Sequence, residues 1–209
     1  MIDKTTQRAY AKINIGLDVL RRRADGYHEV KMIMQTVDIY DELVLERRKE
    51  PGIELRMDNS ELPSGGDNLI CRAADLLFRE KKITGGVNIS LTKRIPIAAG
   101  MAGGSADAAA ALRGLNELFD MGYSLKELQA LGVGLGADIP YCLAGGTMLS
   151  EGIGEILTPL PAPPEICGPN QKWFTVIFSV VMDTTVGLMA LATSTAGAPP
   201  LSSPDMATF

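Results

Sequence analysis

Apolar and polar side chains alternate along the first stretch of the chain, between residues 9 and 20. Apolar residues at every second position predict a half-buried strand. The residues on its apolar face are Ile13, Ile15, Leu17 and Val19. Lys12, Asn14 and Gly16 then share the opposite face, which places an ammonium and an amide side by side on one surface of the predicted strand.

The same period of two predicts further strands over residues 30–37, 42–47, 53–57 and 87–92. Asp25-Gly26 between the first two apolar stretches is typical of a hairpin turn. The chain therefore begins with β-structure that is largely antiparallel.

A period of three to four residues predicts helices in the middle of the chain. The first runs from residue 69 to about 82, and the second starts at Ser105 as its N-cap and ends at residues 120–122. Shorter helices are expected over 124–131 and 138–143, with glycine-rich residues 132–136 between them. Strands and helices together predict a mixed α+β fold.

The last part of the chain differs from the rest. Residues 173–209 carry only two charged side chains, Asp183 and Asp205. Residues 173–182 are typical of a strand, and the apolar run is shorter than the roughly 18 residues that a membrane-spanning helix needs. Residues 194–209, rich in Ala, Pro, Ser and Gly, are expected to form an unstructured tail.

The charge and the cysteine content exclude several classes of function. A formal charge of −5 and a pI near 5.0 argue against a nucleic-acid binder, which would need clustered Lys and Arg. The three cysteines have no C-x-x-C spacing and predict neither a disulfide framework nor a zinc site. With no apolar signal segment at the N-terminus, we expect a cytoplasmic protein that does not engage membranes. Phosphate chemistry on a small molecule stays open.

A glycine-rich loop of very small residues joins the strand at 87–92 to the second long helix. Gly100, Gly103 and Gly104 permit positive φ and lack a Cβ, so backbone N–H groups can converge on an anion at the helix N-terminus. The loop is neither a G-x-x-x-x-G-K-[ST] loop nor a G-x-G-x-x-G fingerprint. The alternative is a flexible loop before an Ala-rich helix that packs closely on a sheet.

Two charged residues have both a structural and a chemical interpretation. Asp138 precedes a short predicted helix, where it is either an N-cap or a general base. Lys12 is either a solvated side chain on the sheet or part of a site with Asn14.

The predicted hairpin turn carries the sole histidine, His28, next to Tyr27. The two side chains are either exposed without a binding role, or they stack on and hydrogen-bond a heterocyclic base. The arginines at 21–23 are either a solvated turn or a contact for substrate phosphates.

Five segments, taken in order, resemble the 4-diphosphocytidyl-2-C-methyl-D-erythritol kinases of the galactokinase, homoserine kinase, mevalonate kinase and phosphomevalonate kinase (GHMP) superfamily. They are AYAKINIGL at 9–17, DGYHE at 25–29, PIAAGMAGGSADAAA at 96–110, GADIP at 136–140 and GIGEILTPL at 152–160. Homoserine kinases are a weaker match because they do not account for Gly26-Tyr27-His28.

The resemblance implies a fold and a division of the chain. Residues 1–164 would form the GHMP amino-terminal catalytic and ATP-binding lobe, a mixed sheet with helices on one side like domain 2 of ribosomal protein S5. Residues 165–209 would be an atypical tail, the remnant or the replacement of the second lobe, since the third glycine-rich motif of the family is not found there. A frameshift, a premature stop or a misread gene boundary would explain this departure.

The resemblance also implies an activity, the ATP- and Mg²⁺-dependent phosphorylation of the 2-hydroxyl of 4-diphosphocytidyl-2-C-methyl-D-erythritol. Asp138 would be the base, Lys12 would assist it, Asn14 would contact the erythritol, and Tyr27 and His28 the cytosine. The residues implied to hold ATP are Pro96, Ile97, Ala98, Ala99, Gly100, Met101, Ala102, Gly103, Gly104, Ser105 and Ala106, with Ser105 near the metal.

At Ala106 many relatives carry a second hydroxyl, so one donor is lost here. Because the second lobe is not recognised, an alternative stays open: an inactive or only nucleotide-binding fragment. Either form is expected to be a monomer or a weak homodimer whose partner is a small molecule rather than a nucleic acid.

Overall fold

The computed structural model describes residues 2–58, 65–162, 174–182 and 186–194. The chain divides into two compact units, Met1–Ala162 and Pro163–Phe209. All the residues discussed as candidates for chemistry lie in the first unit.

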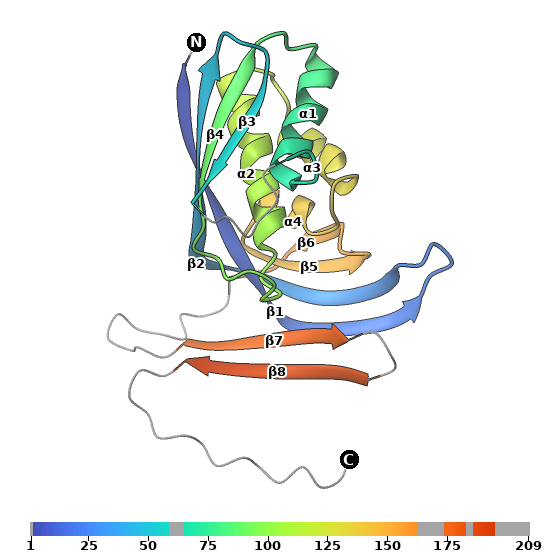
Figure 1. Cartoon of the computed structure of the whole chain (residues 1–209). Helices are drawn as coiled ribbons and strands as arrows, with labels where there is room; N and C mark the ends of the chain where they lie inside the picture. Colours follow the sequence, from blue (N-terminus) through green and yellow to red (C-terminus); the bar gives the residue numbers. More distant parts are fainter. Residues whose placement is uncertain (1, 59–64, 163–173, 183–185, 195–209) are drawn as a thin grey trace, which may run out of the picture. The chain divides into compact units, whose positions relative to one another are not determined.

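The first unit is built on a six-stranded mixed sheet (Figure 1). Its strands are β1 (Lys4–Arg22), β2 (His28–Arg48), β3 (Gly52–Met57), β4 (Gly86–Thr92), β5 (Thr147–Gly152) and β6 (Ile156–Pro159). The order is β3-β4-β2-β5-β6, with β1 paired along β2, and only β3 and β4 run parallel. Strands β5 and β6 were not among the predicted elements.

Strand β2 is one continuous strand, so the predicted break between residues 37 and 42 is wrong. The strand changes partners there: residues 30–35 pair with β5, and residues 42–48 pair with β4. Thr36 accepts the N–H of Gly146 at 3.0 Å, and Asp41 accepts that of Ile95 at 2.8 Å, so these polar side chains bond to neighbouring loops instead of breaking the strand. Asp38 and Asp41 interrupt the apolar alternation between residues 37 and 42, which is why the sequence pattern suggested two strands.

Strand β1 contains bulges that alter the predicted face. Leu17 packs against the buried cluster of Met32, Met34 and Tyr141, as alternation predicts. Ile15 is 45% exposed, against the expectation of burial. The reason is a register shift: Asn14 pairs with Met34 and Gly16 with Ile33, so Ile15 is the extra residue of a β-bulge and has no partner on β2.

Four helices lie on one face of this sheet (Figure 1). They are α1 (Leu69–Lys81), α2 (Gly103–Leu118), α3 (Leu125–Val133) and α4 (Ile139–Ala144). All four were predicted, with ends that differ by a few residues. The mixed α+β class with helices on one side of the sheet is therefore confirmed.

The start of α2 differs from the prediction. Its N-cap is Ala102, in the left-handed conformation with φ of 56°, and not Ser105, which lies in the first turn. No side chain caps this helix. Behind the first turn, α2 presents a run of buried alanines that brings its backbone close to the sheet, with Leu112 and Leu115 completing the core.

In the second unit, β7 (Phe174–Met182) and β8 (Val186–Ser194) form an antiparallel pair. The strand predicted over 173–182 corresponds to β7, and β8 was not predicted. The tail predicted over 194–209 lies, beyond Ser194, outside the described residues. No helix within the described ranges is long and apolar enough to cross a bilayer.

A buried ion cluster joins the sheet to α2. The ammonium of Lys93, just after β4, lies between the carboxylates of Asp41 on β2 and Asp107 on α2. The distance from Lys93 Nζ to Asp107 Oδ2 is 2.8 Å. Asp41 Oδ1 also accepts the backbone N–H of Ile95 at 2.8 Å and that of Arg94. All three charged side chains are at least 92% buried.

When both carboxylates are ionised, the cluster holds one more negative charge than positive. Burial raises the pKa of Asp107 from its ordinary value of 3.8 to about 7; Lys93 opposes this shift and Asp41 adds to it. Burial alone would lower the pKa of Lys93, but the two carboxylates together raise it. Asp107 Oδ1 is buried and, among the described residues, has no hydrogen-bond partner. Asp107 is therefore the least satisfied member of the cluster.

Asp107→Asn should change how stability depends on pH. Between pH 4 and 7 the folded wild type holds a proton on Asp107 that the unfolded chain has released, so raising the pH through this window lowers wild-type stability. Because asparagine does not titrate, the variant's free energy of unfolding relative to wild type should rise from pH 4 to 7 and level off above 7. Urea unfolding of both proteins at several pH values measures this; a difference that stays constant would contradict it.

Candidate functional site

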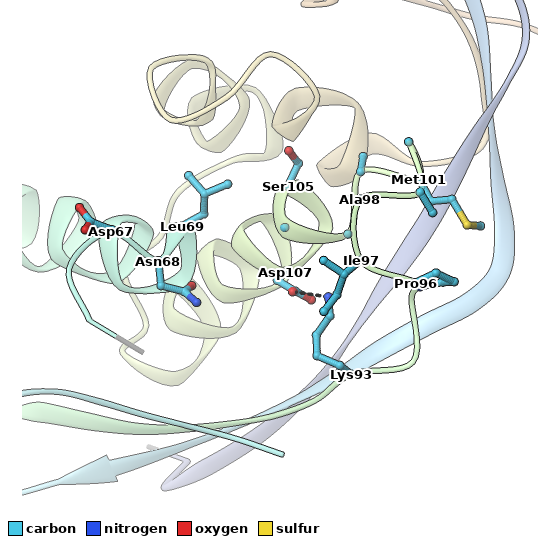
Figure 2. A pocket seen from close by; sticks show the side chains of 15 residues that line it. Asp67, Asn68, Leu69, Lys93, Pro96, Ile97, Ala98, Met101, Ser105 and Asp107 are labelled. Carbon is cyan, nitrogen blue, oxygen red and sulfur yellow. Dashed lines mark hydrogen bonds and ion pairs between the residues drawn. The ribbon is translucent and has the colours of Figure 1, made fainter. Parts of the chain in front are cut away.

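The loop between β4 and α2 forms one wall of a cavity of about 390 Å³ (Figure 2). Every loop residue implied to hold ATP lines it except Ala106, which is buried. The opposite wall comes from Asp67, Asn68 and Leu69 at the start of α1, and Lys93 and Asp107 also line the cavity. The side chain of Asn68 accepts the N–H of Ile70 at 2.9 Å, which fixes the beginning of α1 beside the loop.

The backbone of this loop is left-handed at every second position. Ala98, Gly100 and Ala102 have φ of 57°, 70° and 56°, whereas φ is not positive at the two residues between them. Alternation of right- and left-handed residues turns successive N–H groups toward one side, which makes a concave anion site. The prediction that Gly103 and Gly104 supply positive φ is wrong, because both residues are helical.

Gly103 and Gly104 are needed for space rather than for conformation. A Cβ on Gly103 would lie 3.2 Å from Ile95 Cγ2 and 3.3 Å from Lys93 Nζ, so this residue packs directly on the ion cluster. A Cβ on Gly104 would meet only Leu69 Cδ1, at 3.7 Å. Gly104 is exposed, and its bare backbone therefore faces the cavity rather than the core.

The first turn of α2 offers unpaired donors to this cavity. The first N–H group that bonds back to the chain here is that of Ala106, which donates to Ala102 O at 2.8 Å. Within the described part of the chain, the N–H groups of Gly103, Gly104 and Ser105 have no backbone acceptor. Unpaired N–H groups at the positive end of a helix form a site for a phosphate or carboxylate.

Ser105 connects the cavity to the glycine-rich stretch before α4. Its hydroxyl makes no hydrogen bond to another described residue, and a Cβ on Gly136 would lie 3.8 Å from Ser105 Oγ. Figure 2 shows its side chain directed away from Lys93 and Asp107. The described residues contain no group of three His, Cys, Asp or Glu side chains that could hold a metal ion by themselves.

Asp138 occupies the N-cap position of α4 but does not cap it. Its φ and ψ of −81° and −14° are helical, whereas a capping side chain usually needs an extended backbone. The second helical residue is Pro140, which has no N–H to donate to a capping side chain. The carboxylate is only partly buried, and no described residue bonds to it. The N-cap interpretation is thus not what the structure shows.

Lys12 is only 6% exposed, so the alternative of a solvated lysine is wrong. Its Nζ donates to Asn14 Oδ1 at 3.1 Å, which places both side chains on one face of β1, and its backbone N–H donates to Met101 O of the loop at 3.2 Å.

Cys142 shows that Lys12 and Asp138 lie in one neighbourhood. The pKa of the Cys142 thiol is raised to about 12, mainly by burial; the charge of Asp138 contributes to the rise, and that of Lys12 opposes it. No ion pair joins Lys12 to Asp138 in the described ranges. The two side chains flank the same region and leave the carboxylate available.

Tyr27 and His28 are not brought to the cavity. Tyr27 is 58% exposed, and His28 pairs with Arg22 at the free end of the β1–β2 hairpin (Figure 1). In the same turn, Arg23 forms an ion pair with Asp25 at 3.0 Å, and Arg21 pairs with Glu29. Two of the three arginines thus have local carboxylate partners.

Sequence reasoning missed the ion cluster of Asp41, Lys93 and Asp107. One signal was present: Asp107 is a single charged residue within a run of alanines on the face of α2 that packs on the sheet. A lone carboxylate on an apolar helical face requires a buried cation, and Lys93, directly after the preceding strand, supplies it.

The chain is similar to known kinases in sequence. Residues 68–146 match the model of the GHMP kinases N terminal domain. A 4-diphosphocytidyl-2-C-methyl-D-erythritol kinase of Acetivibrio thermocellus is 50% identical over 161 residues, which are 77% of this chain and 56% of that protein. The enzyme of the same name from Lachnoclostridium phytofermentans is 52% identical over 163 residues, 78% of this chain and 56% of that protein.

Solved structures of kinases are also similar to this chain. A crystal structure of 4-(cytidine 5'-diphospho)-2C-methyl-D-erythritol kinase has a TM-score of 0.65 and 40% identity, covering 76% of this chain and 56% of that one. A mevalonate kinase at 12% identity shares the fold, with a TM-score of 0.59 over 75% of this chain and 56% of that one. The chain thus spans little more than half the length of the relatives it matches. By sequence over residues 68–146 and by fold, the first unit of this chain is similar to the N-terminal domain of the GHMP kinases.

Proposed function

We propose that the chain transfers the terminal phosphate of ATP to the 2-hydroxyl of 4-diphosphocytidyl-2-C-methyl-D-erythritol. The observation that carries this proposal is the loop of small residues over 96–102, which runs into the uncapped N-terminus of α2. The unpaired N–H groups of Gly103, Gly104 and Ser105 and the mostly small residues of the loop suit a polyphosphate. Phosphoryl transfer asks a protein mainly to position reactants and to neutralise the phosphate oxygens.

Asp138 is the base in this proposal. It takes the proton of the acceptor hydroxyl as that oxygen attacks the terminal phosphorus, and it is suited to this because no helix N–H or cation of the described chain engages its carboxylate. The buried ammonium of Lys12, oriented by Asn14, offsets the negative charge of Asp138 and of the hydroxyl oxygen as it loses its proton.

The acceptor lies along β1, in keeping with the similarity to the named kinases. Asn14, next to Lys12, contacts the erythritol part, and Tyr27 and His28 contact the cytosine ring.

Mg²⁺ fits the donor set, although few protein ligands are available. Magnesium at phosphoryl-transfer sites is usually held by one or two protein oxygens together with the substrate phosphates. The Ser105 hydroxyl lines the cavity without a partner in the described chain and would hold the ion. When bound, the ion would neutralise charge on the transferring phosphate.

A second candidate is a domain that binds nucleotide without transferring phosphate. One observation favours it: Tyr27 at the proposed cytosine end is 58% exposed. An exposed ring would hold the acceptor weakly, whereas the loop and α2 are complete within the described residues.

Gly104→Ala should separate nucleotide binding from stability. The backbone at Gly104 is helical and a Cβ there meets only Leu69 at 3.7 Å, so the folded protein accepts the methyl group and gains up to about 1 kcal/mol of helix propensity. The same methyl group stands where the phosphates must approach the N–H groups. We expect an unchanged or higher melting temperature and at least about tenfold weaker ATP binding by titration calorimetry.

Gly134→Ala is the matched control, since Gly134 is also helical and open, with a Cβ position 3.7 Å from Leu131 O, but does not line the cavity. Wild-type ATP affinity in Gly104→Ala would remove the loop from the proposal.

Asp138→Asn should abolish transfer while sparing ATP binding. Loss of a general base lowers kcat by about 10²- to 10⁴-fold, and the ATP dissociation constant should stay within about twofold because Asp138 does not line the phosphate cavity. The assay follows ADP release and the phosphorylated acceptor with the chain as given. The exposed Asp120, at the far end of α2, provides the control Asp120→Asn with wild-type kcat.

The wild-type chain distinguishes the two candidates. Turnover that Asp138→Asn removes supports the kinase. Folded wild-type protein that binds ATP and shows no transfer identifies the nucleotide-binding domain instead, and equal turnover in both proteins rules out Asp138 as the base.

A further inference from the structure

The two ends of the glycine-rich loop are joined by the ammonium of Lys93. Lys93 precedes the loop, and Asp107 follows it on α2, yet Lys93 Nζ lies 2.8 Å from Asp107 Oδ2 (Figure 2). Asp41 bonds the same ammonium and also accepts the N–H groups of Arg94 and Ile95, which lead into the loop. The loop is therefore closed at its base by charge-assisted bonds and not by backbone pairing.

The ammonium of Lys93 also packs against the first turn of α2. A Cβ on Gly103, the first helical residue, would lie 3.3 Å from Lys93 Nζ. The free N–H groups of Gly104 and Ser105 follow directly. A shift of the ammonium or of Asp107 thus moves the helix end whose donors face the cavity.

We propose that Lys93, held between Asp41 and Asp107, is a positioning residue that sets the spacing of the loop and the α2 N-terminus for a nucleotide polyphosphate. This inference rests on the proposed function for its ligand. Lys93 acts through the backbone: its side chain is 8% exposed, and its ammonium is already bound to two carboxylates. Removal of the link at Asp107 leaves the Lys93–Asp41 pair in place and frees only the helix end.

The link contributes to geometry more than to stability. Asp107 carries a buried oxygen without a partner in the described chain, and burial disfavours its charge. Deleting this carboxylate removes an unsatisfied group and leaves alanine, the best helix former, in the helix. Asp107→Ala should therefore keep or raise the unfolding midpoint while it weakens nucleotide binding, a combination that a purely structural contact would not give.

The experiment has two readouts on wild type, Asp107→Ala and Asp107→Asn. The first is amide hydrogen exchange without ligand, followed at the N–H of Lys12, which donates to Met101 O of the loop at 3.2 Å. The second is the dissociation constant for ATP with Mg²⁺. In Asp107→Ala we expect faster exchange at Lys12 and ATP binding weaker by about tenfold or more, because small displacements of positioning groups have large effects.

Asp107→Asn should restore part of both properties, since the amide oxygen still accepts from Lys93 Nζ. Asp75→Ala is the matched control, because Asp75 is also a helical aspartate in an ion pair, with Arg79 on α1 at 2.7 Å. Exchange at Lys12 and ATP affinity in Asp107→Ala that both equal those of wild type would overturn the proposal.

Hydrogen exchange separates this proposal from the proposed function. If wild type fails to bind ATP, the proposed function fails, and exchange at Lys12 still decides whether Asp107 positions the loop: faster exchange in Asp107→Ala supports the positioning, and unchanged exchange overturns it.

Discussion

The site depends on one buried ammonium shared by two carboxylates. Lys93 joins β2, the end of β4 and the start of α2 through Asp41 and Asp107, at the point where β2 exchanges one neighbouring strand for another. Breaking a buried ion pair on one side leaves an uncompensated charge, so such a cluster fixes relative position strongly even where its net stabilisation is small. Both ends of the cavity loop lie at this cluster: the loop begins after Lys93, and the first residue of α2, Gly103, packs on the Lys93 ammonium.

With its ends fixed, the loop itself needs no side-chain contacts. Ala98 and Ala102 adopt a left-handed conformation that usually favours glycine, and a strained backbone of this kind persists only when its surroundings determine it. The result is a wall of mostly small residues beside an uncapped helix end. Each of the two charged residues proposed to act there lacks its simplest structural role: Asp138 does not cap α4, and Lys12 is buried. Both are therefore left for the proton removal that the proposed function assigns to them.

Periodicity alone predicted the α+β class, all four helices and the strands up to β4, because these elements are amphipathic and long enough to show their period. It failed in two places: Asp38 and Asp41 suggested a break in β2, and the extra residue of a bulge exposed the apolar side chain of Ile15. The short strands β5 and β6 lack a pattern of their own and exist through pairing with β2. In the site, the small residues of the loop could be read from the sequence, but their conformations could not, since alanine at positions 98 and 102 does not predict a positive φ. The ion cluster joins residues far apart in sequence, and no local signal places Asp41 beside Lys93 and Asp107.

We propose that the loop and the first turn of α2 hold the phosphates of a nucleotide. A crystal structure of the chain grown with a non-hydrolysable ATP analogue and Mg²⁺ tests this most directly. We expect phosphate oxygens within hydrogen-bond distance of the N–H groups of Gly103, Gly104 and Ser105, with Lys93 still bound to Asp41 and Asp107. Phosphates bound elsewhere on the domain, with these N–H groups left free of ligand, would contradict it.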